Sequence, residues 1–243
     1  MAESAVTEKN SPLYTFGRSF GWLLLRVLMP VKYHGFEKLH ERKGPFVLIA
    51  NHRHALDPVV LAYPVREQCV FLGKKELAKN SFFRRVLTSL HCILVDRHNA
   101  DMEAMRACMK ALRMGKVLVI FPEGTRTHEG QMEQIESGAS LIVLRGKAPL
   151  IPVYLDRKLS WFRRTGAWVG DPIPYEDLLE KGVNRETCEA LNERMRETFR
   201  RMIREAEKSA GQGARSGVLR EFQNFFRKKY FFSRIFCMHA ENN

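Results

Sequence analysis

The chain has 243 residues, of which 45% are hydrophobic and 28% charged. This length and composition are typical of one folded domain with extensions, and they exclude a disordered, collagen-like or disulfide-scaffold chain. The 40 lysines and arginines exceed the 27 acidic residues, which gives a formal net charge of +13. A chain this basic is expected to bind a polyanion: nucleic acid, an anionic membrane surface or a phosphorylated substrate.

The five cysteines are widely spaced and follow no metal-ligand pattern, which indicates reduced thiols in a cytosol-facing protein.

Residues 1–33 are predicted to form an amphipathic helical segment that associates with a membrane. Residues 13–32 are mostly apolar, but Arg18 and Arg26 interrupt them. The uninterrupted apolar run is therefore far shorter than the roughly 20 residues that cross a bilayer. The two arginines return to about the same side of a helix, which favours a helix in the headgroup region with its cations toward phosphate. A helix packed on the protein core is the alternative.

Short apolar runs alternate with helix-forming stretches over residues 34–184. Helices are expected over residues 100–114 and 132–144. The runs expected to form buried strands are residues 45–50, 70–72, 92–95, 117–121 and 150–155. This alternation predicts one α/β domain over residues 34–184, with a mostly parallel central sheet flanked by helices.

Two segments follow the predicted domain. Residues 185–210 form a charged helix-forming run whose apolar residues recur at spacings of three and four, so one face should pack on the domain. Residues 211–243 begin as a glycine-rich linker and continue as a basic amphipathic tail. Contact with a membrane surface is the favoured interpretation of this tail, and a partner helix or ordinary core packing are the alternatives.

His52 and Asp57 are the candidate catalytic residues. They follow the strand expected at residues 45–50, and the carboxyl end of a parallel strand usually meets the active site. A histidine can take a proton from an attacking hydroxyl at neutral pH, and a carboxylate on its other ring nitrogen fixes the tautomer. Asp57 and Pro58 stand where a helix is expected to begin, and a turn there would bring the two side chains together.

A second polar motif follows the strand expected at residues 117–121. Gly124 permits close approach of the backbone, and Arg126 offers a planar guanidinium to a phosphate. An arginine in this position is more often part of a surface ion pair. Arg126, however, follows a Pro/Gly turn at the same edge of the predicted sheet as His52, and this position favours phosphate binding.

The order of these motifs resembles that of the glycerolipid acyltransferases, the family typified by 1-acylglycerol-3-phosphate acyltransferase. The matching blocks are NHxxxxD at residues 51–57, GKKEL at 73–77, VDR at 95–97, FPEGTR at 121–126 and a proline-centred strand at 151–153. Several blocks in the right order over about residues 45–155 make a highly specific match. Two positions depart from the family pattern: His54 stands where serine is usual, and Arg84 where glycine is usual.

The resemblance implies direct transfer of an acyl group from a thioester, coenzyme A or acyl carrier protein, to the free hydroxyl of a lysophospholipid. It implies neither a cofactor nor a metal. In that scheme His52 is the general base and Asp57 orients it. The implied substrate-binding residues are the phosphate ligands Arg126, Lys74 and Arg97, and the residues around the glycerol, Glu123, Gly124 and Thr125.

The favoured acceptor is lysophosphatidic acid, acylated on its sn-2 hydroxyl to give phosphatidic acid. Another lysolipid, such as a lyso-ornithine lipid, is the alternative. The protein is expected to be a peripheral or monotopic membrane protein with its active site facing the cytoplasm, because the acceptor lies in a bilayer while the thioester arrives from water.

Two other classes of function are less well supported. The order His52, His54, Asp57 is similar to the HxHxDH ligand run of metallo-β-lactamase-like hydrolases, but the aspartate stands one position late and Pro58 occupies the place of a histidine ligand. A non-catalytic basic module could bind a membrane or nucleic acid through the tail. The sequence carries no nucleic-acid-binding signature, so no nucleic-acid partner is expected.

Overall fold

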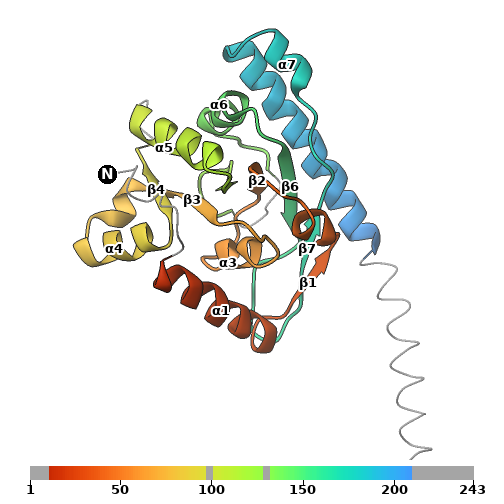
Figure 1. The fold of residues 1–243 in the computed structure, drawn as a ribbon. Helices are drawn as coiled ribbons and strands as arrows, with labels where there is room; N and C mark the ends of the chain where they lie inside the picture. The colour runs from red at the N-terminus through yellow and green to blue at the C-terminus, as the bar shows by residue number, and fades with distance from the viewer. Residues whose placement is uncertain (1–10, 97–100, 128–131, 210–243) are drawn as a thin grey trace, which may run out of the picture. The chain divides into compact units, whose positions relative to one another are not determined.

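The computed structural model describes residues 11–96, 101–127 and 132–209 (Figure 1). Arg97 and the predicted tail at residues 211–243 lie outside the described residues. The chain divides into two compact units, residues 1–203 and 204–243. The described part of the first unit contains a seven-stranded sheet and the helices around it.

The sheet has the strand order β1-β7-β6-β2-β5-β3-β4. Strand β2 pairs in parallel with β5 and β6, and β3 pairs in parallel with β4 and β5. Strand β7 runs antiparallel to β6, and β1 is parallel to β7. The predicted mostly parallel sheet is confirmed. The strands are β1 Val31–His34, β2 Phe46–Ala50, β3 Cys69–Lys74, β4 Cys92–Val95, β5 Val117–Ile120, β6 Leu150–Leu155 and β7 Thr165–Val169.

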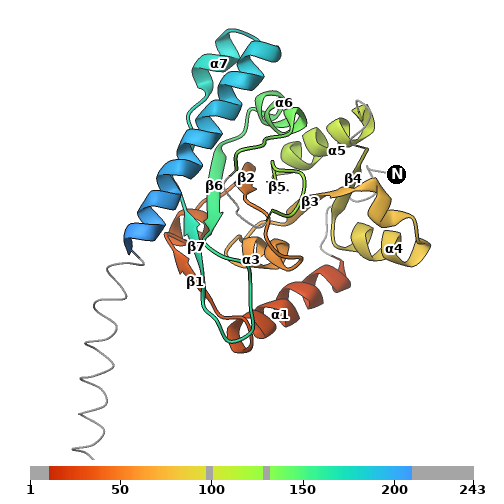
Figure 2. The ribbon, with the colours of Figure 1, turned by 180° about the vertical axis from the view of Figure 1, so that it is seen from behind.

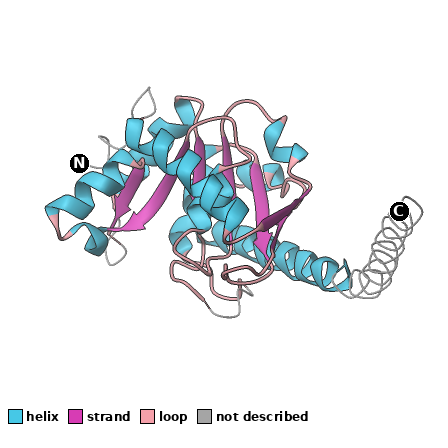
Figure 3. Cartoon of the chain, turned by 90° about the horizontal axis from the view of Figure 1, so that it is seen from below, coloured by secondary structure: helices cyan, strands magenta, loops and turns pink. Residues whose placement is uncertain are grey.

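Helices lie around this sheet (Figures 2 and 3). The α-helices are α1 Pro12–Val27, α2 Glu37–His40, α3 Asp57–Ala62, α4 Ser81–Ser89, α5 Met102–Arg113, α6 Ser137–Gly146 and α7 Glu176–Glu180. A 3-10 helix, η2, covers Lys75–Ala78, and a long helix over residues 185–209 follows α7. None of the helices in the described ranges has both the length and the apolar character needed to cross a bilayer.

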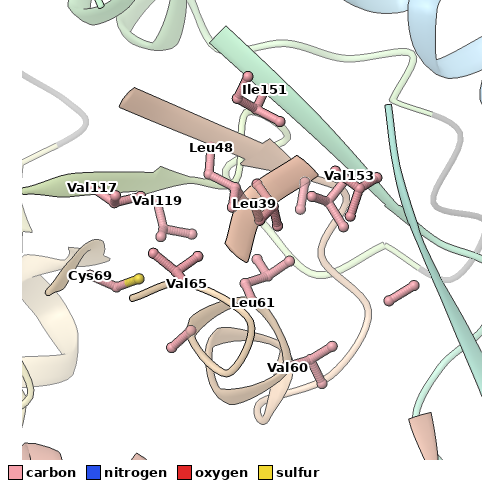
Figure 4. Packing of buried hydrophobic residues seen from close by; sticks show 14 of the residues in the cluster. Leu39, Leu48, Val60, Leu61, Val65, Cys69, Val117, Val119, Ile151 and Val153 are labelled. Carbon is pink, nitrogen blue, oxygen red and sulfur yellow. The ribbon is translucent and has the colours of Figure 1, made fainter. Parts of the chain in front are cut away.

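The hydrophobic core lies where the central strands meet α3. Every residue of β2 and β5 is buried, as expected of strands covered on both faces. Leu48, Val119 and Val153 of the sheet belong to the same buried cluster as Val60 and Leu61 of α3 (Figure 4). This packing holds the end of β2 and the start of α3, which carry His52 and Asp57, in fixed positions.

Strands β1 and β7 were not predicted, and β1 begins before the expected domain boundary at residue 34. Both lie on the edge side of the sheet. β1 has only four residues, all of them partly or fully exposed, and β7 contains Gly166, which weakens the strand signal. Two short segments therefore extend the sheet beyond what apolar runs indicate.

Two predicted helices begin later than expected. The first starts at Met102, because the Asp101 carboxylate caps it by accepting a hydrogen bond of 2.9 Å from the main-chain N–H of Ala104. The second starts at Ser137. Met132, the expected first residue, is buried and has a φ of 57°, a left-handed conformation that is incompatible with the interior of a right-handed helix.

Helix α1 is both packed and exposed. Arg18 donates hydrogen bonds to the carbonyls of Tyr63 (3.2 Å) and Val65 (2.6 Å), so the prediction that this cation points toward headgroup phosphate is wrong. Tyr14 is buried, and its hydroxyl accepts a bond of 3.1 Å from the main-chain N–H of Cys69. The other side of the helix carries an exposed apolar stripe: Leu13, Phe16, Phe20, Leu23 and Val27. One face of α1 thus packs on the protein, as the core-packing alternative predicts, and the opposite face is apolar and exposed, as the amphipathic-helix prediction expects.

Candidate active site

The predicted site residues gather at the carboxyl edge of the sheet. His52 follows β2, Glu123 follows β5, and Lys74 ends β3. Strand β5 lies between β2 and β3 and is parallel to both. The end of β3 is therefore about two strand spacings, roughly 10 Å, from the end of β2. Three sequence motifs that are far apart in the chain leave the sheet at the same edge.

His52 and Asp57 are in direct contact. His52 Nδ1 lies 2.9 Å from Asp57 Oδ2. Asp57 is the first residue of α3 and its side chain is 1% exposed, while that of His52 is 20% exposed. Because Nδ1 is occupied by the carboxylate, Nε2 is the ring nitrogen left to receive a proton. The predicted turn at the start of the helix is confirmed and produces a histidine–carboxylate pair.

The turn between the two residues is held by the same carboxylate oxygen. Asp57 Oδ2 also accepts hydrogen bonds from the main-chain N–H groups of Arg53 (2.6 Å) and His54 (2.7 Å). The main-chain N–H of Asp57 in turn donates to the carbonyl of His54 over 3.0 Å. Residues five positions apart do not share one face of a regular helix. His52 and Asp57 nevertheless meet, because this tight turn folds the chain back toward Asp57.

Glu123 connects the two main motifs. Its Oε2 accepts a bond of 2.9 Å from the main-chain N–H of His52. Its Oε1 accepts from the Thr127 hydroxyl (2.9 Å) and from the main-chain N–H of Met132 (3.3 Å). Glu123 is 6% exposed, and Thr127 N–H also donates to the carbonyl of His52. A direct contact of Glu123 with substrate stays a prediction, whereas its contacts with the protein position the backbone of His52.

Two further residues support the histidine. The Phe121 ring stacks on the His52 ring, with centroids 4.1 Å apart. The Asn51 amide pairs with the main chain of Leu155, donating over 3.0 Å and accepting over 2.8 Å, which joins the end of β2 to β6. Neither residue was predicted as part of the site. The only signal for them in the sequence was their place inside the NHxxxxD and FPEGTR blocks.

The FPEGTR block places its last residues at the surface of the site. Gly124 has a φ of 68°, a left-handed conformation that glycine adopts without strain, and the chain reverses there. Thr125 and Arg126 are exposed, and Lys74 is partly exposed. Partial burial lowers the pKa of His54, and the charges of Lys158 and Arg126 lower it further, whereas Asp57 raises it. Arg126 is therefore close enough to act electrostatically on the His52–Asp57 turn.

Three buried cysteines are unsuited to nucleophilic chemistry. Burial raises the pKa of the thiols of Cys69, Cys92 and Cys108 to about 12, which keeps them protonated at neutral pH. Within the described ranges, no cluster of three or more histidine, cysteine, aspartate or glutamate side chains is arranged to hold a metal ion.

A family model described as "Acyltransferase" matches residues 30–156. This range contains strands β1 to β6 in chain order, and it contains both catalytic candidates. The chain belongs to this acyltransferase family. The predicted family and the predicted acyltransferase activity are thereby confirmed.

Relatives of this acyltransferase extend the match beyond the family region. The 1-acyl-sn-glycerol-3-phosphate acyltransferase of Streptococcus pneumoniae is 28% identical over 206 residues, which are 82% of this chain and 76% of the relative. The enzyme of the same name from Bacillus subtilis is 29% identical over 194 residues, 76% of this chain and 96% of the relative.

A solved structure shares the fold of this acyltransferase. The 1-acyl-sn-glycerophosphate (LPA) acyltransferase PlsC from Thermotoga maritima aligns with a TM-score of 0.59 and 20% sequence identity, covering 80% of this chain and 78% of that chain.

Proposed function

We propose that this acyltransferase transfers a fatty acyl group from an acyl thioester to the sn-2 hydroxyl of lysophosphatidic acid, giving phosphatidic acid in phospholipid synthesis. The observation that carries the proposal is the His52–Asp57 pair, 2.9 Å apart, at a sheet edge that also presents the exposed Arg126. The pair supplies a base for a hydroxyl, and the guanidinium supplies a ligand for a phosphate. The names of the two bacterial relatives support the same acceptor.

The proposed mechanism follows from which nitrogen of His52 is free. Nε2 takes the proton of the acceptor hydroxyl as the oxygen attacks the thioester carbonyl carbon. Asp57, hydrogen-bonded at Nδ1, stabilises the imidazolium that forms. Collapse of the tetrahedral intermediate breaks the carbon–sulfur bond, and the departing thiolate takes the proton back from Nε2. His52 is thus regenerated, and no group of the protein is consumed.

The acceptor phosphate is assigned to Arg126, Lys74 and Arg97. Arg126 can bind two phosphate oxygens at once, while Lys74 contributes a point charge from the neighbouring strand β3. Gly124 and Thr125, in the turn before Arg126, would border the glycerol. Arg97 lies outside the described residues, so its part in the site rests on the family resemblance alone.

We also propose that the protein is a peripheral membrane protein whose site faces the cytoplasm. Acceptor and product both live in a bilayer, whereas the thioester is delivered from water. The exposed apolar stripe of α1 and the basic tail at residues 211–243 are the proposed contacts with an anionic membrane surface. Nucleic acid is not expected as a partner.

The test is acyl transfer from labelled thioesters to a panel of lysolipids. Both coenzyme A and acyl carrier protein serve as donors, and the acceptors include lysophosphatidic acid and a lyso-ornithine lipid. We expect the highest kcat/KM with lysophosphatidic acid and its loss in His52→Ala. Preference for an acceptor without a phosphate, with Arg126→Ala as active as the unmodified enzyme on it, would refute the proposed acceptor class.

A further inference from the structure

The connection between β6 and β7 carries an unusual concentration of cations and aromatic rings. We call residues 157–164, with the sequence RKLSWFRR, the basic aromatic turn. Its four basic residues are exposed: Arg157, Lys158, Arg163 and Arg164. Trp161 is 57% exposed and Phe162 is 75% exposed. Two neighbouring aromatic side chains that leave most of their surface in water form an exposed apolar patch, and such patches often mark a binding surface.

The backbone of the turn is fixed in the conformation that exposes both rings. Leu159 is 4% exposed and anchors the turn, and Ser160 and Arg163 form a β-bridge across it. Phe162 has a φ of 57°, which a bulky residue rarely adopts. Its main-chain N–H donates a bond of 2.7 Å to the carbonyl of Leu28, just after α1. The fold therefore maintains an unfavourable local conformation whose effect is to present Trp161 and Phe162 to solvent.

The basic aromatic turn adjoins the exposed stripe of α1. Val27, the last residue of that stripe, directly precedes Leu28, which accepts the bond from Phe162. Figures 1 and 2 show from opposite sides that the connection between β6 and β7 reaches the end of α1. The turn therefore lies next to the end of the helix that carries the stripe.

The same turn begins beside the active site. It follows β6, whose carboxyl end lies at the same sheet edge as that of β2. The Arg53 guanidinium donates a bond of 2.8 Å to the carbonyl of Asp156, the residue before the turn. Lys158 lies near enough to His54 for its charge to act on that ring. A surface bound to this turn would thus lie close to the segment that carries His52 and Asp57.

We propose that the basic aromatic turn is a second membrane contact, which docks on an anionic bilayer beside the active site. Tryptophan and phenylalanine favour the interface between headgroups and acyl chains, and arginines next to them bind lipid phosphates. The inference rests on the proposed function, because only an enzyme with a lipid acceptor needs its active site at a membrane. It adds a membrane contact that lies between the α1 stripe and the sheet edge of the active site. A lysolipid in the bilayer would then enter the site without leaving the membrane surface.

A second copy of the chain is the competing occupant. In a symmetric dimer formed through this turn, the same patch would meet itself, bringing two sets of four cations together. Like charges in contact are destabilising, whereas an anionic bilayer neutralises them. Charge complementarity therefore favours lipid over self-association.

The experiment compares vesicle binding of three forms of the full chain. Trp161→Ser/Phe162→Asn removes both rings and keeps a residue that tolerates the left-handed conformation at position 162. Arg113→Gln/Arg145→Gln is the control, because both arginines are exposed and precede strands at the opposite edge of the sheet. Co-sedimentation uses vesicles of phosphatidylcholine with phosphatidylglycerol and vesicles of phosphatidylcholine alone.

We expect the aromatic variant to bind anionic vesicles roughly tenfold more weakly or worse, with an unchanged melting temperature, and the control to bind as the unmodified chain does. Transfer to a vesicle-embedded acceptor should fall relative to transfer to a short-chain, water-soluble acceptor. Equal binding of the aromatic variant and the unmodified chain would overturn the proposal. Loss of a dimer in analytical ultracentrifugation of the variant would assign the turn to self-association instead.

The binding result is independent of the acceptor. If the unmodified chain acylates no lysolipid in the panel, the proposed function fails, while vesicle binding still decides the role of the turn. Trp161 fluorescence gives a second readout, because the chain has only two other tryptophans, Trp22 and Trp168. A blue shift on adding anionic vesicles that is smaller in Trp161→Phe than in the unmodified chain places the Trp161 ring at the membrane. A shift of the same size in both chains comes from the other two tryptophans and would contradict the proposal.

Discussion

The sheet edge with the proposed active site and the α1 side of this acyltransferase are built on opposite principles. At the edge, Asp57 and Glu123 are almost fully buried, and main-chain N–H groups bind their carboxylates. On the α1 side, a row of apolar side chains and the rings of Trp161 and Phe162 are left in solvent. Catalysis needs reacting groups that are positioned to within a fraction of an ångström. Binding to a fluid lipid surface needs exposed apolar area and positive charge, but no fixed partner atoms.

Replacing His52, the proposed general base, should have the largest effect, and it should affect catalysis without affecting membrane binding. We expect His52→Ala to lower kcat by about a thousandfold or more, because general base catalysis and the Asp57 pair are lost together. Rates with lysophosphatidic acid measure the loss. Vesicle binding and the circular dichroism spectrum should stay the same, because His52 is partly exposed and contributes its ring only to the pair and the Phe121 stack. Full activity in this variant would refute the mechanism.

Glu123→Gln tests whether this carboxylate acts on His52 or on substrate. The amide would present N–H groups where the N–H of His52 or the donors from Thr127 and Met132 now point. We expect kcat to fall roughly tenfold to a hundredfold with little change in the acceptor KM, since a misplaced histidine loses alignment rather than affinity. A rise in KM with kcat preserved would return Glu123 to the substrate-binding residues.

Arg126→Ala should mainly affect acceptor binding. Loss of a guanidinium–phosphate interaction is expected to raise the acceptor KM about tenfold, with a smaller effect on kcat. The matched control is Arg113→Ala, an exposed arginine at the opposite edge of the sheet, which should leave both constants unchanged. An equal effect of both variants would mean that general positive charge, not a phosphate ligand, is responsible.

Deleting residues 213–243 addresses the lipid side alone. The removed segment carries six basic and two acidic residues, and we expect a severalfold loss of binding to anionic vesicles. Transfer to a water-soluble acceptor should persist. The loss should add to that of the Trp161/Phe162 variant, because separate contacts with one surface reinforce each other. Unchanged partitioning of the truncated chain would remove the tail from the membrane contacts.

The two regions also differ in how far the sequence predicts them. Short motifs are enough for His52 and Asp57, because their partners lie within one turn and the strand before them is an unmistakable apolar run. Arg18 could not be predicted, because its acceptors, the carbonyls of Tyr63 and Val65, are more than 40 positions away. Likewise, β1 and β7 are strands because β1 pairs with β7 and β7 pairs with β6. The local sequence pattern does not predict this pairing.

The smallest expected effect concerns the seam between the regions, where α1 packs on α3. A Cβ at Gly21 would lie 2.5 Å from Cγ1 of Val59, a stiff side chain on the helix that begins with Asp57. Gly21→Ala should therefore destabilise the fold by about 1–2 kcal/mol and lower Tm by a few degrees. Gly17→Ala in the same helix is the control, because its Cβ would meet Leu90 at 3.6 Å, an ordinary contact.

Because alanine favours helix over glycine, Gly17→Ala should be neutral or slightly stabilising. Thermal unfolding of both variants, with and without anionic vesicles, measures the difference. If Gly21→Ala also lowers kcat toward a soluble acceptor while Gly17→Ala does not, strain on Val59 reaches the turn at Asp57, and α1 sets the position of the His52–Asp57 pair. If Gly21→Ala is as stable as Gly17→Ala, α1 lies loosely on α3 and the two regions are mechanically independent.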